Sequence, residues 1–155
     1  MKIGLLSYRS HPYSGGQGIY VKHLSKALSR LGNDVSVISG PPYPDLDDAV
    51  RLIKIPSLDL FASEDRLREF KLKYLLNPLD FYEWITVMTG GFPEPYTYGK
   101  RLLKYLESSS PDFDVLLDNQ SLCSSLLQIQ KLYPLAVTIH HPITKDHKLE
   151  MDNAK

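Results

Sequence analysis

The chain has 155 residues, of which 43% are apolar, and its 18 lysines and arginines balance its 18 aspartates and glutamates. This size and composition suit one domain with one core, and the balanced charge excludes a global field that would attract nucleic acid or an anionic membrane. One cysteine excludes an internal disulfide, and because neither a signal peptide nor an apolar run of about 18 residues is present, we expect a cytoplasmic protein.

The first predicted unit is a strand, a glycine-rich loop and a helix. An apolar run at residues 3–6 gives the strand, and a helical pattern covers residues 19–31. The apolar stripe of this helix is formed by Tyr20, Leu24, Leu28 and Leu31. The loop contains Gly15, Gly16 and Gly18.

Those three glycines leave no side chains between the backbone and a ligand above the start of the helix. The first N–H groups of a helix have no internal partner and carry the positive end of its dipole, so we expect a phosphate there. The alternative is a tight turn that merely needs glycine.

Two better-known phosphate loops do not fit. A P-loop needs a lysine in register after its glycines, and none follows here. The dinucleotide fingerprint needs a small residue where Val21 stands and an acidic residue after the second strand, which instead ends in Ser39-Gly40. NAD and ATP in those modes are therefore not expected, and we predict no cofactor.

The middle of the chain is less regular. A second strand is predicted over residues 34–40 and a third over 50–55, and helices are predicted over 81–88 and 97–107. Before them, Ser63-Glu64-Asp65 caps a helix whose basic residues lie within 66–73. This helix is either an ordinary solvated helix or one that lies on a membrane surface.

The second half restarts the alternation of strands and helices. A fourth strand is predicted over 113–119, a helix from Ser121 to about Leu132, a fifth strand over 135–139, and the start of another helix within 143–155. The whole pattern predicts an α/β fold, a Rossmann-like doubly wound parallel sheet.

Polar groups follow three of the predicted strands. In an open parallel sheet, ligands bind beyond the carboxyl ends of the strands, where the strand order reverses. We expect the reversal between the first and fourth strands, so that the glycine loop, Asp118-Asn119-Gln120 and His140-His141 converge on one crevice. The Asp118–Gln120 group is either a ligand for substrate or a cap of the next helix.

One histidine of the pair is expected to face this crevice. It would hydrogen-bond a substrate hydroxyl or take its proton, while the other packs. A metal held by both is not expected, because neighbours on an extended segment point in opposite directions.

Two Asp-x-Asp triplets raise the possibility of a metal-dependent sugar transferase of another architecture. Asp45-Leu46-Asp47 lies in a proline-rich loop, and Asp112-Phe113-Asp114 stands at the start of a strand, the wrong end for a ligand. We interpret them as a solvated loop and a strand lead-in, and predict no metal site.

Several segments together resemble the amino-terminal opening of family 4 glycosyltransferases of the GT-B fold. They are Lys2–Ser7, Tyr13–Val21, Leu31–Pro44, Phe113–Gln120 and Thr138–Asp146. The resemblance implies two Rossmann-like domains facing across a cleft, the first holding mainly the acceptor and the second the nucleotide-sugar. Residues 58–94 match least clearly.

The resemblance also implies roles for the residues of the crevice in a retaining, metal-independent sugar transfer. The Gly15-Gly16 loop, with Gly18, would approach the donor diphosphate, and His140 would lie near the transferred sugar and the acceptor hydroxyl as the catalytic residue. The acceptor side would be lined by Asp118, Asn119, Gln120 and His141. Oriented N–H groups can stabilise a leaving diphosphate without metal, and the carboxylate pair of a glycosidase is not found in this crevice.

One family signature is missing. No two glutamates stand eight positions apart, so the Glu-x7-Glu motif of the donor-binding second domain is absent. We interpret residues 1–155 as a truncated acceptor-side domain without the carboxyl-terminal nucleotide-sugar domain, inactive alone. The alternatives are a stand-alone module that binds a phosphosugar or nucleotide, and a structural relic without a ligand.

The expected partners follow from the same resemblance. They are a nucleotide-sugar donor, a sugar or lipid-linked acceptor and the missing domain, but not nucleic acid. Residues 66–73 are a candidate for peripheral contact with the inner face of the membrane.

Overall fold

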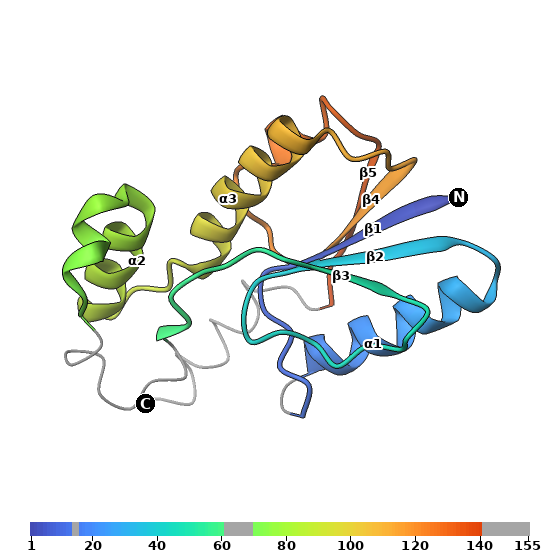
Figure 1. The fold of residues 1–155 in the computed structure, drawn as a ribbon, viewed down its shortest axis with the longest axis horizontal. Coiled ribbons are helices and arrows are strands. Elements are labelled where there is room, and N and C mark those ends of the chain that lie inside the picture. Colours follow the sequence, from blue (N-terminus) through green and yellow to red (C-terminus); the bar gives the residue numbers. More distant parts are fainter. Residues whose placement is uncertain (14–15, 61–69, 141–155) are drawn as a thin grey trace, which may run out of the picture.

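The fold is built on a parallel sheet. The computed structural model describes residues 1–13, 16–60 and 70–140, and these form a five-stranded sheet (Figure 1). The strands are β1 (Lys2–Ser7), β2 (Asp34–Ser39), β3 (Arg51–Lys54), β4 (Val115–Asn119) and β5 (Leu135–Thr138). Neighbouring strands are parallel in the order β3-β2-β1-β4-β5. The doubly wound sheet and the reversal between the first and fourth strands are both confirmed.

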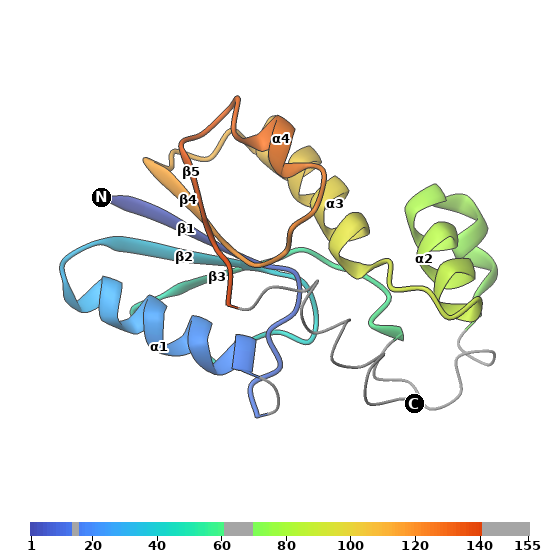
Figure 2. The same cartoon turned by 180° about the vertical axis from the view of Figure 1, so that it is seen from behind.

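Helices cover both faces of the sheet. Helix α1 (Gly16–Arg30) lies on one face, and α3 (Glu94–Ser109) and α4 (Leu126–Ile129) lie on the other (Figures 1 and 2). Helix α2 (Pro78–Met88) and the 3₁₀ turn η2 (Leu72–Leu76) stand to one side of the sheet. None of the helices in the described ranges is long and apolar enough to cross a membrane.

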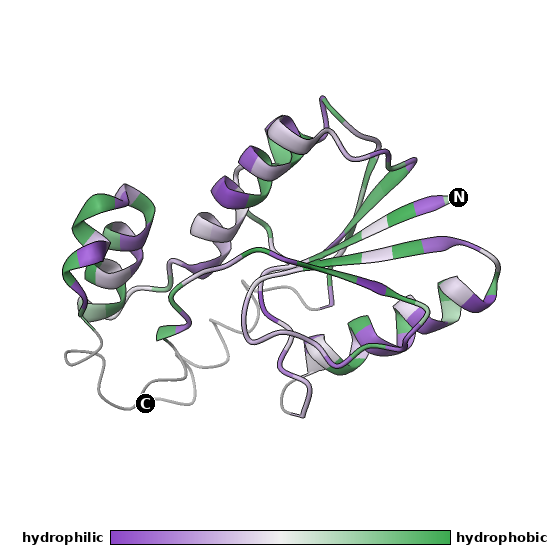
Figure 3. Cartoon of the chain, viewed as in Figure 1, coloured by the Kyte–Doolittle hydropathy of each residue, from purple (hydrophilic) through white to green (hydrophobic). Residues whose placement is uncertain are grey.

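Each face of the sheet has its own apolar core, because successive side chains of a strand point to opposite faces. Leu6 and Ile38 belong to the core beneath α3, whereas Leu5 and Val37 belong to the core beneath α1. Apolar residues recur along the strands (Figure 3). Such two-sided burial is typical of a parallel sheet.

The apolar stripe of α1 agrees with the prediction only in part. Leu24 and Leu28 pack on the core as predicted, and Val21 is fully buried beside them. Leu31 is 78% exposed, so its assignment to the stripe was wrong. The helix ends at Arg30, and Gly32, with a φ of 83°, turns the chain away as a left-handed cap.

The helix predicted from Ser121 to about Leu132 is also wrong in extent, because α4 covers only Leu126–Ile129. The φ angles of Gln120 and Leu122 are +53° and +48°, which an α-helix does not allow. The hydroxyl that should cap the helix, that of Ser121, bonds to Asp118 instead.

Two other helices are longer than predicted. Helix α2 begins at Pro78 because Asn77 accepts the Leu79 N–H at 3.1 Å, and proline is well suited to a first turn. Helix α3 likewise begins three residues early, at Glu94. The helices predicted from Ser63 and within 143–155 fall largely or wholly outside the described residues.

Candidate functional site

The carboxyl ends of three strands meet at one edge of the sheet. Leu6 of β1 is in register with Asp118 of β4, and Asn119 of β4 is in register with Thr138 of β5. The groups that follow these strands in the sequence are therefore neighbours, as predicted. Gly15 and His141 lie outside the described residues.

The contact that joins these groups is between two rings. The imidazole of His140 lies 4.6 Å from the ring of Tyr20, centroid to centroid, with an interplanar angle of 82°. Tyr20 stands four residues after Gly16, one helical turn into α1. The start of the first helix and the histidine after the fifth strand are thus on the same side of the sheet edge.

Tyr20 was predicted only as part of an apolar stripe. Its position four residues after Gly16 could have indicated the contact, because residues four apart share a helix face. The sequence does not reveal the turn of the chain after β5 that brings His140 to Tyr20 of α1.

Two side chains after β4 hold His140. Asn119 Oδ1 lies 2.6 Å from His140 Nε2, and Gln120 Oε1 accepts a hydrogen bond from the His140 backbone N–H at 2.9 Å. Asn119 and Gln120 are only 4% and 6% exposed, whereas His140 is exposed. The predicted Asn-Gln and histidine groups therefore contact each other directly.

Asp118 has a different environment. It is fully buried, and its two carboxylate oxygens accept hydrogen bonds from the backbone N–H (2.9 Å) and the hydroxyl (2.5 Å) of Ser121. Burial raises the pKa of this carboxyl, and the bonds from Ser121 oppose that rise in part. The carboxylate thus stabilises the turn after β4, and its contact with an acceptor stays a prediction.

The two described glycines of the loop have different surroundings. A Cβ on Gly18 would lie 2.1 Å from the carbonyl oxygen of His11, so the close approach of two backbones requires glycine there. A Cβ on Gly16 would meet nothing within 4 Å. The fold therefore explains Gly18, but it does not explain Gly16.

The Asp-x-Asp triplets are held by lysines. Asp45 and Asp47 pair with Lys22 and Lys26 of α1 at 2.6 and 2.8 Å. Asp112 pairs with the side chain of Lys2, while Asp114 accepts its backbone N–H. These contacts support the interpretation as a loop and a strand lead-in.

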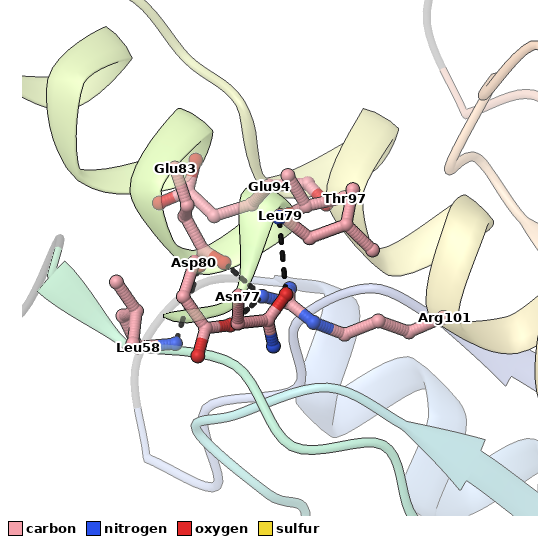
Figure 4. Close-up of polar contacts among 8 residues, drawn as sticks. All are labelled: Leu58, Asn77, Leu79, Asp80, Glu83, Glu94, Thr97 and Arg101. Carbon is pink, nitrogen blue, oxygen red and sulfur yellow. Dashed lines mark hydrogen bonds and ion pairs between the residues drawn. The ribbon is translucent and has the colours of Figure 1, made fainter. Parts of the chain in front are cut away.

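A second polar cluster lies away from the crevice, between α2, α3 and the segment after β3 (Figure 4). One guanidinium nitrogen of Arg101 lies 2.7 Å from a carboxylate oxygen of Asp80 and 2.7 Å from one of Glu83. The other oxygen of Glu83 accepts the Leu58 N–H at 3.3 Å. Arg101 and Asp80 also line a groove of about 590 Å³. This cluster was not predicted, because its members are far apart in the sequence.

Two curated proteins resemble the chain in sequence. It is 49% identical over 157 aligned positions to an MMP α-(1→4)-mannosyltransferase of Mycolicibacterium hassiacum, covering 100% of this chain and 38% of that protein. It is 34% identical over 99 positions to a probable sucrose-phosphate synthase of Thermosipho melanesiensis, covering 54% of this chain and 22% of that protein. The chain thus spans well under half the length of either relative. No family model matches it.

Solved structures resemble the chain only loosely. One example is LpCGTa in complex with UDP, with a TM-score of 0.47 and 19% identity over 88% of this chain and 29% of that one. The carboxyl-terminal domain of a Pyrococcus furiosus hydrogenase has the same TM-score, with 18% identity over 89% and 91% of the two chains. Likenesses at this level join proteins of unrelated function and do not indicate one.

Proposed function

We propose that this chain, which belongs with the family 4 glycosyltransferases of the GT-B fold, forms the acceptor-side part of a sugar-transferring enzyme. The enzyme would move a sugar from a nucleotide-sugar donor to an acceptor hydroxyl. Because the relative that matches the whole chain is named a mannosyltransferase, mannose is the first sugar to test.

The contact between Tyr20 and His140 supports this proposal most directly. It places a titratable imidazole within 4.6 Å of a ring in the first turns of α1. A donor diphosphate at the helix start would then lie near a group able to hydrogen-bond the acceptor hydroxyl. Gly16, around which there is open space, would allow the close approach of the diphosphate.

We propose a retaining reaction without a metal ion or a resident cofactor. The leaving nucleoside diphosphate gains negative charge as the glycosidic bond breaks. The N–H groups and positive dipole end at the start of α1 would stabilise that charge in place of a cation. His140 would accept a hydrogen bond from the acceptor hydroxyl, and Asn119, Gln120 and His141 would line the acceptor side.

A cytoplasmic enzyme with a sugar or lipid-linked acceptor fits this proposal. Contact with the inner face of a membrane through residues 66–73 belongs to it as well. Of this range the structure describes only the last four residues, which include the cations Lys71 and Lys73.

A chimera tests the proposed function. Residues 1–155 replace the aligned segment of the M. hassiacum mannosyltransferase, and sugar transfer from nucleotide-mannose is measured beside the parent enzyme. We expect transfer by the chimera and, with His140→Gln, a fall in kcat of about 10²-fold, the lower range for a positioned proton-transfer group. A folded chimera that binds the donor but transfers nothing would instead favour the stand-alone binding module.

A further inference from the structure

We infer that Asn119 is a positioning residue for His140, and that it fixes the imidazole with the hydrogen on Nε2. Nδ1 is then the nitrogen that meets the acceptor hydroxyl. The role of Nδ1 in catalysis rests on the proposed function. The orientation of the ring by Asn119 rests on the contacts alone.

The 2.6 Å contact between Asn119 Oδ1 and His140 Nε2 sets the direction of the hydrogen bond. An amide oxygen can accept a hydrogen bond but cannot donate one. The contact is therefore a hydrogen bond only when Nε2 carries a hydrogen. In a neutral imidazole the other nitrogen, Nδ1, then has the free lone pair.

The backbone of Asn119 is held by the sheet. Asn119 is the last residue of β4, is paired in register with Thr138, and is 4% exposed. The strand therefore sets the position of the Asn119 backbone, and the buried amide contacts the exposed imidazole of His140. The place of Asn119 at the end of β4 thus determines where its amide contacts the imidazole of His140.

Two more contacts limit the movement of His140. Gln120, with a φ of +53°, turns the chain so that its side-chain oxygen accepts the His140 backbone N–H at 2.9 Å. Tyr20 packs against the imidazole nearly at a right angle. Gln120 therefore holds the backbone of His140, Tyr20 packs on its ring, and Asn119 contacts a ring nitrogen.

The uncharged side chain of Asn119 suits its proposed role in orienting His140. An aspartate at position 119 would also accept from Nε2, but it would add a charge beside the imidazole. The asparagine orients the ring without that charge. The site then offers Nδ1 as a hydrogen-bond acceptor to the acceptor hydroxyl.

Nitrogen-15 NMR of the 155-residue chain tests the structural part. Long-range correlations of the histidine rings, assigned with His140→Gln, distinguish the two tautomers. We expect the Nε2–H form of His140 in the wild type, and in Asn119→Leu a shift toward the averaged signals of a free histidine. The matched control is Gln120→Leu, which loses the backbone bond and should leave the tautomer unchanged. A wild-type Nδ1–H form, or no change in Asn119→Leu, would overturn the inference.

Kinetics of the chimera test the catalytic part. Asn119→Leu should lower kcat by about tenfold, a part of the 10²-fold or more that a positioned proton-transfer group contributes, with the donor KM unchanged. Asn119→Asp, which keeps an accepting oxygen, should restore most of the loss. An inactive chimera, together with the Nε2–H form of His140 in the wild-type chain, would refute the proposed function but not the positioning by Asn119. An active chimera, together with the Nδ1–H form, would refute the positioning but not the proposed function.

Discussion

Gly16 and Gly18 are two residues apart, but glycine is required at position 18 by the fold and is proposed at position 16 for the contact with the donor. A methyl group on Gly18 would collide with the backbone of His11, whereas one on Gly16 would enter open space. Gly18→Ala should therefore destabilise the chain by about 1–3 kcal/mol, the usual cost of overpacking. Urea unfolding measures this cost.

Gly16→Ala is the matched variant, and we expect its free energy of unfolding to stay within about 0.5 kcal/mol of the wild type. If a diphosphate rests against the start of α1, the added methyl should raise the donor KM of the chimera by about tenfold or more, which corresponds to about 1.4 kcal/mol. An unchanged donor KM would leave the glycine loop with a structural role only.

Asp118 gives a prediction about pH. Because burial raises its pKa, the folded chain binds this proton more tightly than the unfolded chain does. Relative to the protonated carboxyl, the ionised carboxylate therefore lowers the stability of the folded chain, and this cost grows as the pH rises from the unfolded pKa through the folded one. In Asp118→Asn this cost is absent, so the stability of the variant relative to wild type should increase from near pH 4 to near pH 7. Urea unfolding at both pH values checks this, and a constant or falling difference would contradict it.

At the scale of elements, the Arg101 cluster joins α2 to α3 and to the segment after β3. Glu83 is 1% exposed, and its partner Arg101 has a side chain only 12% exposed. Removal of one member of a buried ion pair leaves the other charge without compensation, so Arg101→Met should destabilise the chain by about 3 kcal/mol. Hydrogen exchange should show the loss first in α2.

Lys104 is the control for that prediction. It lies one turn further along α3, lines the same groove and is exposed. Lys104→Met should change stability by no more than about 0.5 kcal/mol. Equal effects of the two substitutions would show that the ion pairs with Asp80 and Glu83 contribute little.

Elements with a regular apolar pattern could be predicted, and elements set by local polar contacts could not. The strands and α1 follow from periodicity and from glycine at position 32. The short α4 depends on the bond between Ser121 and Asp118 and on two positive φ angles, which a sequence that favours helix does not reveal. At the site, the strand ends predicted which groups meet, but the contact of Tyr20 with His140 depends on side-chain direction.

At the scale of the whole molecule, β5 is one of the two edge strands of the sheet formed by the described residues, β3 being the other. It pairs with β4, and Val137 of β5 and Ile139, which follows the strand, are 43% and 63% exposed. An exposed edge strand with apolar side chains is a template for pairing with another chain. We therefore predict that the 155-residue chain self-associates through β5, and that sedimentation velocity shows this as a dependence on concentration.

A charge on that edge should suppress the association. Val137→Lys should weaken it by about tenfold or more, or about 1.4 kcal/mol, because lysine on an edge strand opposes pairing between copies. Leu31→Lys is the control, since Leu31 is 78% exposed and lies at the end of α1, away from β5. A chain that stays monomeric at NMR concentrations, or one whose association responds to Leu31→Lys and not to Val137→Lys, would show that this edge is not the contact surface.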